Sequence, residues 1–552
     1  MTTNARDGKA VDRVALEQLP ALSPALKSRN PLAWVTVFGP GAIVASLTIG
    51  TGELLFSARA GSLFRYDILW LFLATCILKW ALVFCTGRHL VLSGGHPLQR
   101  YCELPGPRAW FPILLLIFGV STFPVWNAFL SGVLGTLGQN LAQNYDVAID
   151  SHVFAAAAIV IITAAWLTGG YDRVERVQVV IVVTMLVAVS ISVIMLNPDW
   201  VAILKGLFVP KSLAYPDWLS TAPEPVQAAL ADRPVWLETT NYVGVIGGSG
   251  FDYLCYVSFM RNKTWGMTKG PAVPLAELEA ATPEQKRLLR SWLRAPLVDA
   301  TVSFAIVLVF AIVFVAAGET VLRERELIPH GDNLLNQQAE VFRTAFDPSW
   351  ADFFVWLYVA GAILAMVGTL YGLLELVPAL IAEAVCAIMG RPAPNVTPKL
   401  RLGSAIYVSL SGLGILLWSY LYSRAGGEGN PPALVAIITP ANLFTGVLAC
   451  SFICILNPWM DFRFLPKGMR MHPILVVLNV IGGIFFGILG ATAYWEWGQS
   501  QFPDGINFLG FFRLDGSVIG VVVFCVTVLI GFGTAIILRV FRGSSGGLQS
   551  DA

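Results

Sequence analysis

The chain has 552 residues, of which 56% are hydrophobic and only 13% are charged, and its formal net charge is +1. A soluble protein would carry about a quarter charged residues, so this composition is that of a polytopic membrane protein. The even balance of charge gives no reason to expect a nucleic-acid partner. The first 30 residues are polar and of mixed charge, without the apolar core of a signal peptide, and predict a cytoplasmic tail.

Apolar runs predict twelve membrane-spanning helices, since a spanning helix needs roughly 20 residues. They lie near 34–60, 66–92, 110–138, 152–170, 175–197, 238–261, 297–318, 350–380, 402–422, 433–455, 472–494 and 517–540. Lys and Arg gather in the loops after every second span, which places both termini in the cytoplasm. We therefore expect an all-α protein of a bacterial-type inner or plasma membrane, with the lipid bilayer as its surrounding partner.

Three units follow from this pattern. A tail over 1–30 is expected to precede a transmembrane domain over 31–540, and a second cytoplasmic tail over 541–552 to follow it. Two helices are expected outside the spans. Trp200–Phe208 is amphipathic, and Thr282 followed by Pro283 is a typical helix start.

Cysteine and histidine give no sign of a metal centre or of catalysis. The eight cysteines fall mostly in or beside apolar runs and are expected to be small buried hydrophobes. The five histidines lie at predicted span ends or in loops, where we expect them to be solvated. No nucleophile–base–acid set is visible, so an enzyme is not expected, and no cofactor is predicted.

Two of the predicted spans are interrupted by glycine at corresponding places. The first reads Gly50-Thr51-Gly52-Glu53, and the sixth reads Gly247-Gly-Ser-Gly-Phe-Asp252. They are five spans apart, so each opens one half of a possible five-plus-five inverted repeat, about 34–197 and 238–455, with 472–540 as extra helices. Paired interrupted helices indicate a transporter site at the membrane midplane. The alternative is that these glycines only allow close helix packing.

Ionisable residues within the spans are functional candidates. Glu53, Lys79 and Asp252 lie deepest, and Lys79 is placed to pair with either carboxylate or to have a purely structural role. Glu375 is a weaker candidate for lining the cavity. Asp299, near a helix N-terminus, is interpreted as structural.

The first span, from Gly39-Pro-Gly to Ala60-Gly61, resembles the first helix of the Nramp family of divalent metal transporters. Thr86-Gly-Arg88, Leu204 to Pro210 and Val243 to Gly247 resemble the family in the same order. The resemblance implies the LeuT-type fold, with two inverted five-helix repeats and discontinuous helices 1 and 6. It covers most of the chain and is clear in spans 1, 2 and 6.

The chain departs from the family where metal binds, and so resembles a divergent branch. Gly-Thr-Gly-Glu stands in place of the family's Asp-Pro-Gly-Asn, and Phe251-Asp252-Tyr253 in place of Met-Pro-His. The acids of the family's proton path fall near Phe129 and Gly132, which have no carboxyl group. Carboxylates and carbonyls without the thioether suit a hard ion such as Mg²⁺ or Mn²⁺.

The candidate site is therefore taken at the two breaks. Substrate is expected to bind Gly50, Thr51, Gly52 and Glu53 in the first span and Gly247, Gly248, Phe251, Asp252 and Tyr253 in the sixth. Glu53 and Asp252 are the expected metal ligands, and Lys79 and Glu375 are coupling or structural charges. The leading hypothesis is a divalent-metal transporter with a remodelled site and a weakened or absent proton path. The alternatives are transport of a small organic solute, such as an amino acid or amine, and a sensor on the same fold.

Overall fold

The computed structural model describes residues 19–37, 39–40, 53–54, 56–143, 146–168, 183–184, 186–191, 193–195, 197–221, 230, 233–269, 271–328, 343, 347–391, 397–424, 439, 442–508 and 512–546. Of the predicted site residues, Gly50, Thr51 and Gly52 lie outside this described part of the chain. Residues 175–182 of the predicted 175–197 span lie outside it as well, so the total of twelve spans stays a prediction.

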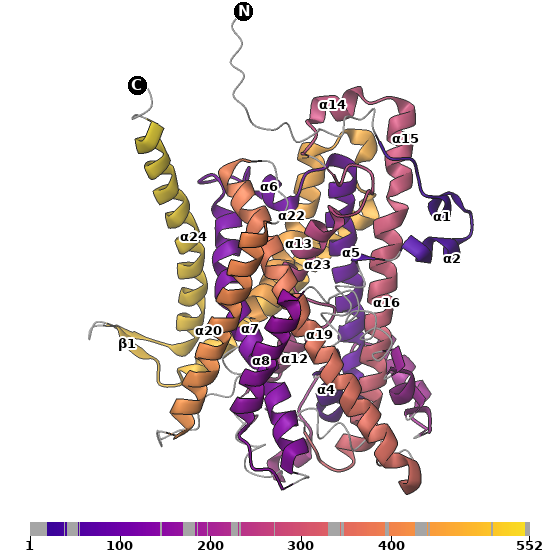
Figure 1. Ribbon diagram of the computed structural model, residues 1–552, viewed down its shortest axis with the longest axis vertical. Helices are drawn as coiled ribbons and strands as arrows, with labels where there is room; N and C mark the ends of the chain where they lie inside the picture. Colours follow the sequence, from indigo (N-terminus) through magenta and orange to yellow (C-terminus); the bar gives the residue numbers. More distant parts are fainter. Residues whose placement is uncertain are drawn as a thin grey trace, which may run out of the picture.

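The described part is a bundle of long helices with short helices between them (Figure 1). Its first half contains α1 (Pro24–Lys27), α2 (Pro31–Trp34), η2 (Val35–Val37), α4 (Ala58–Phe64), η4 (Arg65–Ile68), α5 (Leu69–Ser93), α6 (Pro97–Tyr101), α7 (Trp110–Gln143), α8 (Ser151–Leu167), α10 (Trp200–Phe208), η5 (Asp217–Thr221), α12 (Val235–Val245) and α13 (Gly250–Met260). Its second half contains α14 (Leu275–Ala280), α15 (Pro283–Trp292), α16 (Arg294–Ala317), η6 (Gly318–Arg323), α19 (Pro348–Met389), α20 (Pro398–Arg424), η8 (Leu443–Leu448), α22 (Ala449–Phe464), η9 (Lys467–Met469), α23 (Pro473–Gln501) and α24 (Gly516–Gly546).

Strands are confined to one small hairpin between α23 and α24 within the described residues. β1 (Ile506–Phe508) and β2 (Phe512–Leu514) pair antiparallel, with Asn507 opposite Arg513. The hairpin projects from the side of the bundle near the start of α24 (Figure 1).

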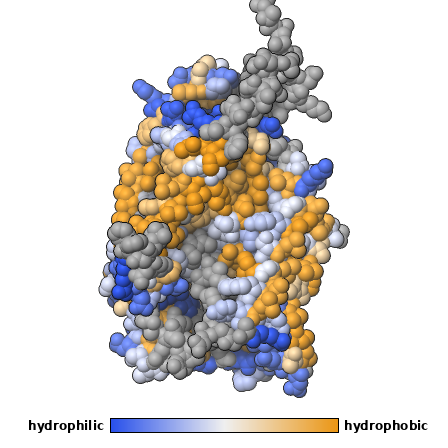
Figure 2. All heavy atoms as spheres, turned by 90° about the vertical axis from the view of Figure 1, so that its left-hand side faces the viewer, coloured by the Kyte–Doolittle hydropathy of each residue, from blue (hydrophilic) through white to orange (hydrophobic). Residues whose placement is uncertain are grey.

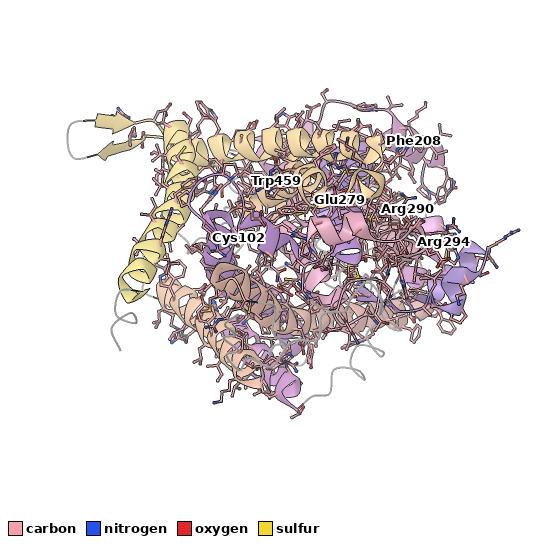
Figure 3. All side chains as sticks on the ribbon, turned by 90° about the horizontal axis from the view of Figure 1, so that it is seen from above. Cys102, Phe208, Glu279, Arg290, Arg294 and Trp459 are labelled. Carbon is pink, nitrogen blue, oxygen red and sulfur yellow. The ribbon has the colours of Figure 1, made fainter. Side chains whose placement is uncertain are left out.

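The most buried spans are those formed by α12 and α13, by η8 and α22, and by α4, η4 and α5. α5 packs on α13, α16, α22 and α23, whereas α7 packs on α8, α19, α20 and α24. Seen from above, α23 and α24 run along the edge of the bundle (Figure 3). The cavity described below therefore lies among helices that have other helices around them.

Nine helices in the described residues are long and apolar enough to cross a membrane, and the shorter α8 is also apolar. On the face drawn in Figure 2, hydrophobic residues form a broad band with hydrophilic residues toward both ends. Such a band matches the hydrocarbon core of a bilayer, because lipid cannot solvate polar groups. The chain is an integral membrane protein.

The two helices predicted outside the spans are present. α10 begins at the predicted Trp200, where the Asp199 carboxylate accepts a hydrogen bond from the N–H of Ala202 at 2.9 Å. α15 begins with a capping box in which Thr282 and Gln285 satisfy each other's backbone N–H groups. Local capping chemistry fixed both of these starts. α14, α15 and the C-terminal end of α24 lie toward the same end of the molecule (Figure 1).

Candidate functional site

The sixth predicted span is broken at the glycines that the sequence singles out. α12 ends at Val245 and α13 begins at Gly250, and between them Gly247 and Gly248 have φ values of +75° and +98°. Residues with a Cβ seldom adopt this left-handed region, so glycine permits the break. A Cβ added at Gly247 would also lie 2.9 Å from the Phe304 ring.

The second half of the broken span begins with a capping box. The Ser249 hydroxyl accepts from the N–H of Asp252 at 3.2 Å, and the Asp252 carboxylate accepts from the N–H of Ser249 at 2.6 Å. The carboxylate therefore stabilises the start of α13, where the helix dipole favours negative charge. Tyr253 follows Asp252 in α13, and its hydroxyl donates back to the carbonyl of Gly247 at 2.7 Å.

Lys79 reaches this break from the middle of α5. Its side chain has no exposed surface, and its Nζ donates to the carbonyl oxygens of Val243 at 2.7 Å, Gly244 at 3.2 Å, Ile246 at 2.8 Å and Gly248 at 2.6 Å. The first two belong to the last turn of α12, whose carbonyls have no partner within the helix. The lysine therefore closes the end of the first half-helix.

Glu53 approaches the same break from the first predicted span. It is fully buried, and its Oε1 accepts from the N–H of Gly247 at 3.0 Å, while its Oε2 has no hydrogen-bond partner. Glu53, Lys79 and Asp252 are thus brought to one place, as the sequence suggested. Among these three described residues, no ion pair within 4.0 Å joins Lys79 to either carboxylate.

A cavity of about 60 Å³ opens beside the break, between α7, the α12–α13 junction, α19 and η8. Asp252 and Phe251 line it, together with Gly248, whereas Glu53 is absent from its described lining. The full lining is Thr122, Phe123, Trp126, Leu130, Gly244, Val245, Gly248, Ser249, Phe251, Asp252, Thr369, Leu373, Leu376, Asn442 and Thr445.

Asn442 is a site residue that sequence reasoning missed. Its Nδ2 donates to the carbonyl of Asn241 at 3.2 Å, which leaves its Oδ1 buried, without a partner, in the wall of the cavity. Thr122 and Thr369 are further polar residues of the lining. These side chains are neutral, so a sequence criterion based on charge does not select them. A polar Asn within an apolar run is nevertheless an indication of a functional residue.

Glu375, proposed as a coupling or structural charge, faces away from this cavity. Its carboxylate accepts from the Trp166 indole at 3.0 Å and forms an ion pair with Arg401, which also covers the Trp166 ring. The α19 residues that line the cavity are instead Thr369, Leu373 and Leu376. Asp299 is buried in α16 and accepts from the N–H of Gly39 at 2.8 Å, in keeping with its structural interpretation.

Two expectations about histidine were wrong. His89 and His96 are fully buried rather than solvated, His89 within α5 and His96 as the cap of α6. His89 lies 3.3 Å from the Asp461 carboxylate, which also binds Arg88. His96 follows the end of α5, and its position in the sequence does not reveal that this segment packs inside the bundle.

Buried ion pairs hold the bundle at other points that the sequence did not identify. Glu238 near the start of α12 pairs with Arg59 at 2.6 Å and with Arg233 at 2.8 Å, and Glu383 of α19 pairs with Arg261. The cysteines follow expectation, since all eight are free and seven of them are buried. The described residues contain no group of three His, Cys, Asp or Glu side chains that could hold a metal ion.

These features define a class. A helical membrane protein whose sixth predicted span is broken into two half-helices, with polar groups converging on the break inside the bundle, has the features of a LeuT-type transporter. The family described as natural resistance-associated macrophage protein-like, Nramp, matches residues 41–374, more than half of the chain. The chain belongs to the Nramp family.

Curated relatives match over part of their length. A divalent metal cation transporter MntH of Brucella suis is 26% identical over 37% of this chain and 44% of its own, and one of Pediococcus pentosaceus is 22% identical over 36% and 44%. The chain therefore matches less than half of each relative. A crystal structure of a mutant manganese transporter of Eremococcus coleocola superposes with a TM-score of 0.65 at 13% identity, over 96% of this chain and 99% of that one. This similarity establishes the fold.

Proposed function

We propose that the protein is a secondary transporter of a divalent metal ion, with the cavity beside the α12–α13 break as its binding site. Family membership supports transport, and the naming of the relatives as divalent metal cation transporters supports the class of cargo. The site itself has been remodelled, because Phe251-Asp252-Tyr253 stands where the family carries a soft ligand.

The observation that carries the proposal is that a carboxylate and a partnerless amide oxygen belong to residues lining one small cavity. Asp252, one of whose carboxylate oxygens accepts from the Ser249 N–H, and Asn442, whose Oδ1 has no partner, both line it, and Thr122 and Thr369 belong to the same wall. No sulfur ligand is among the described lining residues. Oxygen ligands of this kind suit a hard cation such as Mg²⁺ or Mn²⁺.

The size of the cavity also favours an ion. A volume of about 60 Å³ holds a few water molecules, as a partly hydrated ion such as Mg²⁺ requires. Glu53 adds a second carboxyl group behind the Gly247 peptide, from whose N–H it accepts a hydrogen bond at 3.0 Å. We propose that the family's usual proton path is weakened, since the buried Phe129 and Gly132 stand where its acids would be.

A small organic solute is the second candidate, and one observation favours it. Phe123, Trp126 and Phe251 form an aromatic wall, and the charge of Lys79 behind the break opposes a dication. An amine or amino acid would bind such an apolar-walled pocket through Asp252 or the half-helix N-terminus of α13.

Flux of Mg²⁺ and Mn²⁺ into proteoliposomes tests the proposal, with amino acids and amines tested as competitors. Asp252→Asn keeps an oxygen to cap α13 but removes the charge, so it should reduce metal uptake by about 10-fold or more. Glu279→Gln is a comparable change at an exposed residue of α14, which lies at one end of the molecule (Figure 1), and should leave uptake unchanged. If no divalent ion is transported or competes, the metal proposal fails. Displacement by an amine alone would support the second candidate.

A further inference from the structure

The contacts of Lys79 have the form of a bound ion rather than of a side-chain ion pair. Four carbonyl oxygens lie 2.6–3.2 Å from its Nζ, and all four come from a six-residue stretch at the α12–α13 break. An ammonium has only three N–H donors, so there are more acceptors than protons. Channels and transporters likewise surround a bound cation with backbone carbonyl oxygens, which replace its hydration shell.

The surrounding structure fixes these carbonyls independently of the lysine. Gly247 and Gly248 have left-handed backbone conformations that turn the chain around the Nζ. The Tyr253 hydroxyl donates to the carbonyls of Gly247 and Gly248 at 2.7 and 3.1 Å, which orients this stretch of backbone. Val243 and Gly244 supply the carbonyls of a helix C-terminus, which carries partial negative charge. The four carbonyls of Val243, Gly244, Ile246 and Gly248, called the carbonyl cage below, therefore form a cation site made by the backbone.

No acid in the described part of the chain forms an ion pair with the lysine. Glu53 contacts the opposite face of the same break, through the N–H of Gly247, and Asp252 is engaged with Ser249. Neither forms an ion pair with Lys79 within 4.0 Å among these described residues. The positive charge is held by peptide dipoles, as a diffusible ion would be.

We propose that the Lys79 ammonium is a tethered cation that permanently occupies a monovalent-cation site formed by the carbonyls of Val243, Gly244, Ile246 and Gly248. The protein thus carries in its own chain the charge that an alkali or alkylammonium ion would supply there. The inference does not depend on the identity of the cargo, and its test measures stability rather than transport.

Truncation of the side chain should expose the cage to added cations. Purified Lys79→Ala should melt several degrees below the wild type, and ethylammonium should restore part of the loss in a saturable manner. Tetramethylammonium, which has no N–H donor, should not do so at equal ionic strength, and Na⁺ and K⁺ serve as further probes. Lys211→Ala is the matched control, because Lys211 pairs with Asp67 in an exposed ion pair of small expected worth.

Either of two results with the Lys79→Ala protein would overturn the proposal. One is a Lys79→Ala protein that melts with the wild type, and the other is an equal response of that variant to ethylammonium and tetramethylammonium. Lys79→Met, which keeps the stem but donates no hydrogen bond, should also melt below the wild type, and equal stability would again refute the idea. If neither variant survives purification, equal yields of Lys79→Ala in the two ammonium salts would decide against the cage.

Discussion

Replacing Gly247 with alanine tests whether the break in the sixth span is a built feature of the fold. The residue has φ +75°, a conformation that costs a residue with a Cβ about 1–2 kcal/mol. The new Cβ would also lie 2.9 Å from Cε1 of the buried Phe304, and overpacking of this kind costs about 1–3 kcal/mol. Together the free energy of unfolding should fall by roughly 2–5 kcal/mol.

Thermal unfolding in detergent, followed by intrinsic fluorescence, measures this loss. Gly403→Ala in α20 is the control, since its added Cβ meets nothing within 4 Å and a helical alanine should be neutral or slightly stabilising. Combining Gly247→Ala with Phe304→Leu should recover part of the steric cost and none of the backbone cost. If Gly247→Ala melts together with Gly403→Ala, the strained break inferred here does not exist.

Three further predictions follow from the described contacts. Glu53→Gln keeps an acceptor for the N–H of Gly247 and should fold, but should abolish metal flux into liposomes; full activity would count against Glu53 as a site residue. Burial lowers the pKa of His96 to about 4, below its ordinary 6.5, so the unfolded state binds more protons between these values. The contribution of His96 to stability should be constant above pH 6.5 and fall by roughly 3 kcal/mol as the pH drops to 4. The melting temperature of His96→Asn should depend less on pH over that window, and an identical pH dependence would contradict this. Asp461→Asn leaves Arg88 buried without its charge partner and should cost about 3–5 kcal/mol, so an unchanged melting temperature would show that the pair contributes nothing.

The features that the sequence predicted are those with a local signal. Gly247 and Gly248 marked the break because no other residue adopts their backbone conformation without cost. Lys79 and Asp252 were identified because charge within an apolar run is expensive and demands a partner. The start of α15 followed from Thr282 and Pro283, and α10 was predicted from the amphipathic pattern of Trp200–Phe208, whereas its Asp199 cap is known only from the structure.

The features that escaped prediction depend on residues far apart in the chain or on the backbone alone. Arg401, the partner of Glu375, comes from another helix, and nothing near Glu375 in sequence announces it. The burial of His96 depends on α13, where its Nε2 lies 3.1 Å from the Ser258 hydroxyl. The cage around Lys79 consists of carbonyls, which every residue possesses and which therefore leave no trace in composition.

Because the Lys79 ammonium donates hydrogen bonds on both sides of the α12–α13 break, it bears on how the two half-helices can move. Hydrogen bonds to a compact charge on a flexible stem tolerate rotation better than bonds to a planar group do. If the two half-helices tilt against each other, the carbonyls of Val243 and Gly248 move in opposite senses about a fixed point on α5. Lys79 is thus placed to keep hydrogen bonds to both half-helices while the angle between them changes.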